Sequence, residues 1–137
     1  MNVLPGVIMG IATTDGISLV KIGLDELLFT SIVLDTPAGS PYLVKGHPVS
    51  LLFKETEVII ARPPLTISVR NRIECTIKKI EAGKLLSELT LGFTGKGSGQ
   101  EYEIRSIITR EACEQLELKE KDKIIALIKT NEVSLSA

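Results

Sequence analysis

Ser68 and Arg70 are residues whose types and spacing could do chemistry, because both side chains can donate hydrogen bonds to an anion. They stand in the segment "PPLTISVRN" at residues 63–71. If this segment forms a β-strand, alternate side chains share a face, so the hydroxyl and the guanidinium project together. The guanidinium adds a planar fork of donors and a permanent positive charge. The pair suits a small anion, whereas a solvated strand face with a surface ion pair at Arg70 is the alternative.

Further donor groups occur later in the sequence. Lys129 offers a compact second charge, and Thr130 offers a hydroxyl and an amide beside it. Thr109 stands where a short helix begins, and the free amides and positive end of a helix favour an anion. The simpler alternatives are that Thr109 only caps its helix and that Lys129 extends to solvent. Backbone amides that could complete the shell belong to Val69, Ile108, Arg110 and Glu111.

These residues form a set of donors without a carboxylate. A small anion offers acceptor oxygens, so a set of this kind matches its chemistry. The two cations Arg70 and Lys129 would also neutralise the charge of a buried anion, which is very costly when it is unpaired.

Most of the sequence consists of short β-branched runs separated by turn residues, which predicts a mainly β protein. Asp15-Gly16 lies between two such runs and predicts a two-residue hairpin. Residues 35–48 are too rich in proline and glycine for a regular helix, and the only predicted helix covers residues 110–118, with Thr109 as its N-cap. The predicted strands are residues 3–14, 17–23, 27–34, 49–54, 57–61, 67–80, 85–95, 101–109, 123–129 and 132–136.

The same plan of strands occurs twice. "FTSIV" aligns with "IRSII" and "FKETEV" aligns with "IKTNEV", so that Ser31 and Ser106 are 75 residues apart, as are Lys54 and Lys129. Two independent segments with one offset predict two tandem small OB-like β-barrels, with one short helix in the second. The predicted boundaries are residues 1–62 for the first barrel, 63–66 for a proline linker and 67–137 for the second barrel.

Composition argues against several classes of function. The 16 basic and 17 acidic residues give a net charge of −1, and only three Phe, two Tyr and no Trp occur, so we expect no nucleic-acid partner. Cys75 and Cys113 without a CxxC motif, and His47 as the single histidine, argue against a bound metal ion. No catalytic set is evident, so we expect no enzyme. No run approaches the ~20 apolar residues of a membrane span and no signal peptide is evident, so we expect a cytoplasmic chain without membrane insertion.

Three segments of the second half carry a family resemblance. "SVRNRIECTI", "SIITREACEQLEL" and "IIALIKTNEVSLS" resemble, in this order and spacing, the Mop (molybdate/tungstate-binding) domain of the TOBE superfamily. The first half is similar but degraded: "NVLPG" matches the segment that follows the family's arginine, and the arginine itself is missing. The whole chain resembles a tandem di-Mop unit.

The resemblance implies molybdate or tungstate as the ligand, assembly into a homodimer or higher homo-oligomer, and oxyanion sites at interfaces between domains. In the first half, Leu34 replaces Thr109 and Glu55 replaces Thr130, which puts a complete site there in doubt. Metal is expected only as part of the oxyanion. The residues to which the resemblance assigns oxyanion binding are Ser68, Val69, Arg70, Asn71, Ile108, Thr109, Lys129 and Thr130, with Lys54 as a weaker candidate.

Units of this kind occur in three settings. They are free-standing molybdate binders, effector domains of molybdate-responsive regulators, or regulatory parts of molybdate transporter ATPases. The joint "EVIIARPPLTISVRN" is most similar to the last, which predicts a non-catalytic oxyanion module that regulates an ABC transporter, with the ATPase domain upstream or on another chain. Storage or homeostasis, a regulator's effector domain and, more distantly, an OB-type nucleic-acid binder are the alternatives. The sequence does not distinguish molybdate from tungstate.

Overall fold

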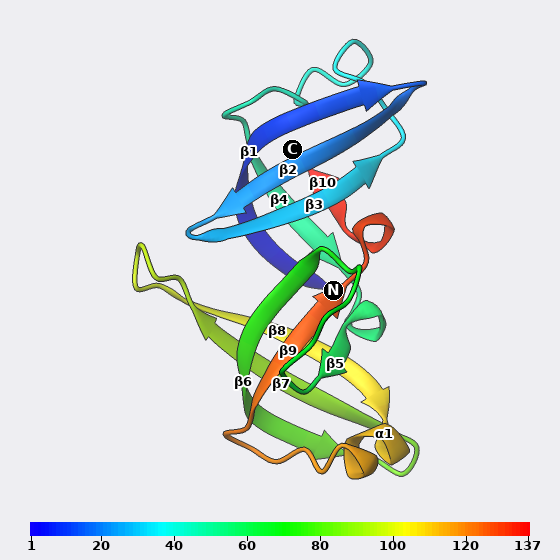
Figure 1. Ribbon diagram of the computed structural model, residues 1–137, viewed down its shortest axis with the longest axis vertical. Coiled ribbons are helices and arrows are strands. Elements are labelled where there is room, and N and C mark those ends of the chain that lie inside the picture. The colour runs from blue at the N-terminus through cyan, green and yellow to red at the C-terminus, as the bar shows by residue number, and fades with distance from the viewer.

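The computed structural model describes residues 1–137, and its strands form two five-stranded sheets that follow one another along the long axis (Figure 1). The predicted mainly β architecture of two small barrels is confirmed. The strands are β1 (Asn2–Thr14), β2 (Ile17–Leu24), β3 (Leu27–Val33), β4 (Pro48–Phe53), β5 (Ile59–Ala61), β6 (Asn71–Ala82), β7 (Leu86–Thr94), β8 (Glu101–Thr109), β9 (Lys123–Ile128) and β10 (Ser134–Ser136). The helical segments are the 3₁₀ turns η1 (Glu55–Glu57) and η2 (Thr130–Glu132) and the helix α1 (Arg110–Gln115).

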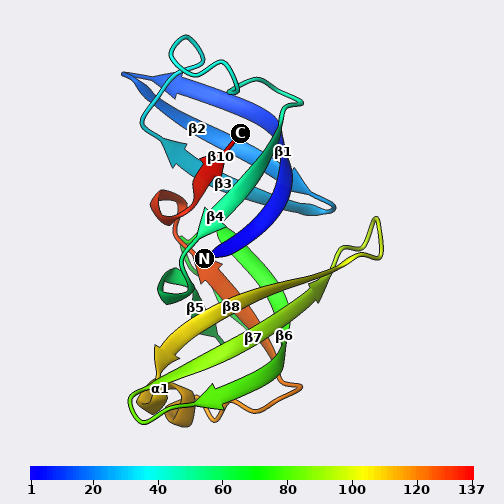
Figure 2. The same ribbon diagram turned by 180° about the vertical axis from the view of Figure 1, so that it is seen from behind.

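The two halves of the chain exchange one short strand each. The first sheet has the order β10-β4-β1-β2-β3, and the second has the order β5-β9-β6-β7-β8. Thus β10 pairs with β4 of the first half, and β5 pairs with β9 of the second half. Figure 2 shows β10 entering the upper lobe beside β4. The division of the chain into two barrels at residues 63–66 stays a prediction. Two strands do not follow this division, because β5 precedes it but belongs to the second sheet, and β10 follows it but belongs to the first sheet.

The hairpin predicted at Asp15-Gly16 is confirmed. Thr14 pairs with Ile17, and the two residues between them have φ angles of 50° and 76°. Positive φ at both central positions is the type I′ geometry, whose twist matches that of the flanking strands.

The core lies on the inner faces of the two sheets. Strands β1 and β6 alternate between buried and exposed residues, and each is interrupted by an irregularity of register, between Ile8 and Gly10 and between Ile77 and Lys79. Such bulges strengthen the local twist and help a small sheet to curl around its core. The Pro/Gly-rich segment forms no helix, as predicted, and is irregular up to Pro48, where β4 begins; its Leu43 is fully buried in the core.

Two expectations about local structure are wrong. The strand expected from residue 67 begins at Asn71, because its partner β9 pairs Asn71 with Ile128 and extends no further. The helix expected to residue 118 ends at Gln115, where the chain turns through Leu116 into Glu117 with a positive φ of 51°. No helix in the structure is long and apolar enough to cross a lipid bilayer.

Candidate functional site

Asn71 ties the start of β6 to β3 of the other lobe. Its Oδ1 accepts a hydrogen bond from the Thr30 amide at 2.7 Å, and its Nδ2 donates to the Thr30 carbonyl at 2.9 Å. The side chain is fully buried and satisfies both backbone groups at a sheet edge that no neighbouring strand covers. The structure therefore gives Asn71 a bridging role, and its contact with an anion stays a prediction.

Asn2 makes the matching bridge in the opposite direction. Its Oδ1 accepts from the Arg105 amide and its Nδ2 donates to the Arg105 carbonyl, both at 2.8 Å. Arg105 on β8 stands 75 residues after Thr30 on β3. The two lobes are therefore joined by a pair of equivalent asparagine bridges.

Equivalent serines fix the two 3₁₀ turns. Ser31 Oγ donates to the Val133 carbonyl at 2.6 Å, and Ser106 Oγ donates to the Val58 carbonyl at 2.8 Å. Val133 follows η2 directly, and Val58 follows η1 directly. The serine contacts therefore hold each turn against the edge strand of the other half, so that η2 lies beside β3 and η1 lies beside β8.

Ser68, Val69 and Arg70 lie in the loop before β6, not on a strand. The expected shared strand face of Ser68 and Arg70 is therefore wrong. The guanidinium instead folds back on its own loop, where Nε donates to the Ser68 carbonyl and Nη2 to the Ile67 carbonyl, both at 3.1 Å. Arg70 is exposed and forms no salt bridge, so its charge has no carboxylate partner within the chain.

Lys129 and Thr130 lie on the same side of the molecule as β3. Lys129 is the N-cap residue of η2 and accepts a hydrogen bond from the Glu132 amide at 3.0 Å through its carbonyl, while its exposed side chain forms no salt bridge. The contact of η2 with β3 and the Asn71 bridge bring predicted site residues from two distant segments to one strand edge. We name this group the β3 junction; its members are Thr30, Ser68, Arg70, Asn71, Lys129 and Thr130.

Ile108 and Thr109 lie elsewhere, at the end of β8 beside α1, which Figure 1 shows at the far end of the lower lobe from η2. Thr109 is the predicted N-cap, since its Oγ1 accepts from the Ala112 amide at 3.0 Å. Antiparallel alternation turns the amide of Ile108 toward Ser87 on β7, because the backbone groups of Arg105 face the opposite edge.

The start of α1 offers an anion fewer free backbone amides than expected. The Arg110 amide donates to the Leu85 carbonyl at 2.8 Å, and the Ala112 amide is capped. One chain therefore does not bring Ile108 and Thr109 together with the β3 junction.

The equivalent group around β8 differs in charge; we name it the β8 junction, and its members are Asn2, Arg105, Lys54 and Glu55. Lys54 is the N-cap residue of η1 as Lys129 is that of η2, and Glu55 takes the place of Thr130. A hydrogen bond from the Met1 ammonium, 2.9 Å from Glu55 Oε2, lowers the pKa of that carboxyl. The β8 junction therefore carries an acceptor-only group where the β3 junction carries a hydroxyl.

Sequence reasoning indicated that the backbone of residues 31–33 could contribute to a shared site, but it missed that Asn71 binds Thr30 at this edge of β3. The contribution of this edge is a backbone, and no side-chain type indicates that a backbone lies beside a distant motif. The available signal was the repeated asparagine at positions 2 and 71, together with the serines at positions 31 and 106.

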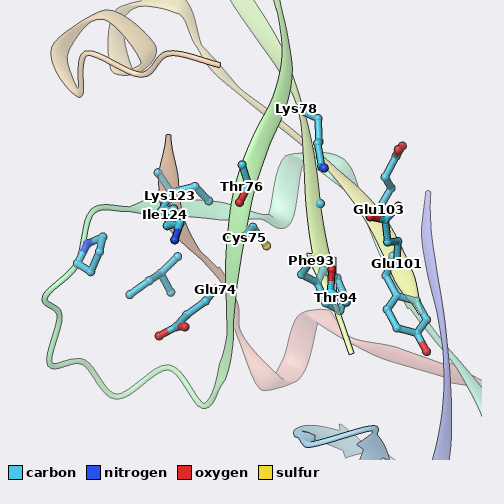
Figure 3. Close-up of a pocket in the computed structure, with 14 residues that line it drawn as sticks. Glu74, Cys75, Thr76, Lys78, Phe93, Thr94, Glu101, Glu103, Lys123 and Ile124 are labelled. Atoms are coloured by element: carbon cyan, nitrogen blue, oxygen red, sulfur yellow. The ribbon is translucent and has the colours of Figure 1, made fainter. Parts of the chain in front are cut away.

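A cavity of about 770 Å³ lies on the second sheet, and none of its lining residues belongs to either junction (Figure 3). In Figure 3, Glu74 and Lys123 lie on one side of β6, and Lys78, Glu101 and Glu103 lie on the other. Three carboxylates among these charges oppose a dianion.

The same cavity reaches Cys75, whose thiol is buried. Burial raises the pKa of Cys75 to about 12, so the thiolate that a nucleophile or metal ligand requires is absent near neutral pH. The cavity thus offers no candidate for cysteine catalysis.

The fold and the donor groups at its joint define a class of protein: paired small β-barrels with exchanged strands and unpaired cations between them. The TOBE domain family matches residues 67–135, and the chain belongs to this family.

Two relatives extend the likeness over nearly the whole chain. The molybdenum-pterin-binding protein MopB of Rhodobacter capsulatus is 32% identical over 133 residues, which cover 94% of this chain and 47% of MopB. The chain thus spans about half the length of this curated relative. A crystal structure of the cytoplasmic molybdate-binding protein ModG, with molybdate bound, superposes with a TM-score of 0.84 at 29% identity, covering 99% of this chain and 95% of ModG. A molybdate-binding protein from Sporomusa ovata is 32% identical over 47% of this chain and 88% of its own, with a TM-score of 0.40.

Proposed function

We propose that this chain is a non-catalytic module that binds molybdate at the β3 junction. The observation that carries the proposal is the placement of Arg70 and Lys129, two exposed cations without carboxylate partners, directly beside the paired residues Asn71 and Ile128, where Asn71 binds the free edge of β3. The nature of the relatives MopB and ModG, which are named for binding molybdenum compounds, supports the choice of oxyanion.

Donors beyond the two cations fit the same chemistry. Ser68 and Thr130 supply hydroxyls, and alternation along β3 turns the Ile32 amide to the same outer edge as the Thr30 amide. Because Asn71 occupies the Thr30 groups, the Ile32 amide is the backbone donor that an anion would use on this edge. The predicted ligands Val69, Ile108 and Thr109 are kept as proposals, and the last two would have to come from another copy of the chain.

A homo-oligomer is part of the proposal, because Ile108 and Thr109 can join the β3 junction only from a second copy of the chain. A site completed by β8 and α1 of a second chain would use Thr109 at the start of its helix, where the amide of Glu111 has no capping partner among the hydrogen bonds of α1. Lys54 remains a weaker candidate, because it lies at the β8 junction beside Glu55.

We place the module in the cytoplasm and favour a free-standing molybdate binder for storage or homeostasis. The sequence led us to expect the regulatory part of an ABC transporter ATPase, but ModG has the same fold over 95% of its own length, which supports a unit that works alone. An ATPase partner and a regulator's effector domain are the alternatives. Tungstate is a second ligand of the same chemistry, since it has the same charge and shape.

Titration calorimetry with molybdate, tungstate, sulfate and phosphate tests the proposal. Molybdate and tungstate should bind, and phosphate should not, because its proton near neutral pH finds no acceptor among these donors. Arg70→Ala should weaken molybdate binding by roughly 10- to 150-fold, the equivalent of about 1.5–3 kcal/mol for a charge-assisted contact.

Arg72→Ala is the matched control. Arg72 is an exposed arginine two residues away, and its Nη2 donates to the Leu65 carbonyl at 3.0 Å, much as Arg70 binds loop carbonyls. Its removal should leave molybdate affinity unchanged. The proposal fails if no oxyanion binds, or if the Arg70 and Arg72 variants lose affinity equally.

A further inference from the structure

The tips of two hairpins meet across the joint between the lobes. The β2–β3 turn (residues 25 and 26) belongs to the first lobe, and the β7–β8 loop (residues 95–100) belongs to the second. Figure 1 and Figure 2 both show this loop reaching past its own lobe toward the β2–β3 turn. We name this contact the tip clasp; its members are Asp25, Glu26, Gly95, Lys96, Ser98 and Tyr102.

Two carboxylates of the first lobe are bound by donors of the second. The Ser98 and Tyr102 hydroxyls both donate to Asp25 Oδ2, at 3.0 and 3.2 Å. The backbone amide of Lys96 donates to Glu26 Oε1 at 2.8 Å. Because the acceptors are charged, these bonds are stronger than bonds between neutral groups. The tip clasp is therefore a specific polar contact between the lobes.

Tyr102 is held in place as a donor to this contact. Its ring stacks on that of Phe93, with the ring centroids 5.2 Å apart. Partial burial, followed by the hydrogen bond to Asp25, raises the pKa of Tyr102. The hydroxyl therefore stays protonated near neutral pH and can donate to the carboxylate.

Asp25 and Gly95 are closely fitted to each other. Asp25 has a φ of 52°, a conformation that glycine adopts at lower cost, so the turn alone does not account for an aspartate here. A Cβ at Gly95 would overlap Asp25 Oδ2, which means that the carboxyl group lies directly over this glycine. Each residue type is explained by the contact that it makes with the other lobe.

The β7–β8 loop is an extension that the first lobe lacks. Phe93 pairs with Tyr102 as Leu24 pairs with Leu27, and Leu27 and Tyr102 are 75 residues apart, the offset of the repeat. The first lobe closes this hairpin with residues 25 and 26 alone, whereas the second adds residues 95–100. Since the same fold closes without these residues, the extension serves the tip clasp and not the barrel.

The tip clasp holds β3 at a point far from the asparagine bridge. Asp25 precedes Thr30 by five residues, which is roughly 15 Å along an extended chain. Asn71 binds Thr30, and the neighbouring Ser31 binds Val133, so these two contacts lie together near the middle of β3. Contacts at one place leave the strand free to rotate about them, and a second contact at a distance removes that freedom.

We propose that the tip clasp positions the edge of β3 for oxyanion binding, with Asp25 as a positioning residue; this role rests on the function proposed above. The donors of the β3 junction come from both lobes, since the Ile32 amide belongs to the first and Arg70 and Lys129 belong to the second. An anion bound by all three groups loses less free energy to ordering when the lobes are already fixed relative to one another.

Gly95→Ala tests the proposal without removing any donor or acceptor. Its Cβ displaces the Asp25 carboxyl, and titration calorimetry should show molybdate affinity about three- to tenfold weaker, the modest effect of losing exposed hydrogen bonds. Gly97→Ala is the matched control, because a Cβ there would stand 3.6 Å from Asp25 Oδ1, an ordinary contact. Neither glycine has a positive φ, so the loop backbone tolerates alanine at both positions.

A second pair of variants separates the contact from a general defect of the loop. Asp25→Gly should weaken molybdate binding as Gly95→Ala does, because it removes the same carboxylate. Adding Gly95→Ala to Asp25→Gly should then change nothing further, since the Cβ has no carboxyl group to displace. Additive losses would mean that alanine harms the loop by itself and would overturn the proposal.

Amide hydrogen exchange of the ligand-free protein gives a readout that does not depend on molybdate. The Thr30 and Arg105 amides, which bind the asparagines across the joint, should exchange at least about threefold faster in Gly95→Ala, while ladder amides within each sheet keep their rates. Unchanged exchange at Thr30, or equal acceleration of the ladder amides, overturns the proposal, as does equal molybdate affinity of Gly95→Ala and Gly97→Ala. If the wild type binds no oxyanion, the proposed function fails, and exchange at Thr30 still decides whether the clasp holds β3.

Discussion

The β3 junction and the β8 junction share one mechanical design and differ in charge. Each has an asparagine that binds both backbone groups of an edge strand, and each has a serine that holds the chain beyond a 3₁₀ turn. Only the β3 junction keeps the arginine that precedes the asparagine and the threonine that follows the lysine, while at the β8 junction Met1 precedes Asn2 and Glu55 takes the threonine's place. The comparison teaches that the contacts that join the lobes are separable from the groups that would bind an anion. The joining contacts occur at both junctions, whereas the full set of anion donors occurs only at the β3 junction.

Thr130→Glu should have the largest effect, because it gives the β3 junction the carboxylate of the β8 junction. A unit charge about 4 Å from another costs about 4 kcal/mol at an effective dielectric of 20, which corresponds to nearly a thousandfold loss of molybdate affinity. Calorimetry should detect no binding. Glu55→Thr is the reciprocal control and should leave the affinity unchanged; equal effects of the two variants would remove the distinction between the junctions.

Asn71→Ala should destabilise the fold by about 2–4 kcal/mol, because it leaves the amide and the carbonyl of buried Thr30 without partners. Asn2→Ala should cost a similar amount through Arg105. Urea unfolding of both variants measures the two values. A cost confined to Asn71 would mean that the two bridges are not mechanically equivalent.

Lys129→Ala should weaken molybdate binding by roughly 10- to 100-fold, as expected for the loss of a charge-assisted contact. Lys54→Ala should change the affinity by less than about threefold, since a carboxylate stands beside it and screened charges at a distance contribute little. Competition with a fixed tungstate concentration gives both ratios. If Lys54→Ala weakens binding as much as Lys129→Ala, both junctions hold anions.

The smallest expected effects concern acid stability, where the two lobes again differ. A hydrogen bond from Arg62 lowers the pKa of Asp122 in the second lobe, and the Ser40 hydroxyl followed by the Thr36 amide lowers the pKa of Asp35 in the first. In both cases the folded protein binds fewer protons than the unfolded chain. The stabilisation is therefore present above the unfolded pKa of about 4 and is lost as the pH falls through the folded value.

Only the Asp122 contribution should depend on salt, because its partner is a guanidinium whereas those of Asp35 are neutral. Acid unfolding followed by circular dichroism at low and high salt tests this, with Asp122→Asn and Asp35→Asn compared. High salt should bring the wild type toward the Asp122→Asn curve. Salt should not change the difference between the wild type and Asp35→Asn.

The features predicted correctly from the sequence are those that short stretches of chain determine. The Asp15-Gly16 turn needs only two residues that tolerate positive φ, and the Thr109 cap needs only a hydroxyl before a helix. The repeat was visible because both halves keep the same serines and lysines at a constant offset. A local pattern is enough for each of these.

The features that could not be predicted depend on contacts between distant segments. The strands β5 and β10 are only three residues long and carry no preference for one sheet over the other. Arg70 lies outside a strand because β9 ends at Ile128, which its own neighbours do not reveal. The separation of Thr109 from Lys129 likewise follows from the arrangement of the lobes, so the assignment of both to one site remains a prediction.

The exchange of β5 and β10 also sets when the protein can fold during its synthesis. Most domains fold from the N-terminus while the ribosome is still adding residues. Here the edge of β4 stays open until residues 134–136 exist, since Leu51 pairs with Leu135, and β5 waits for β9, since Ile60 pairs with Ala126. The second sheet can therefore close once β9 exists, whereas the first sheet closes later, because β10 follows β9 in the chain.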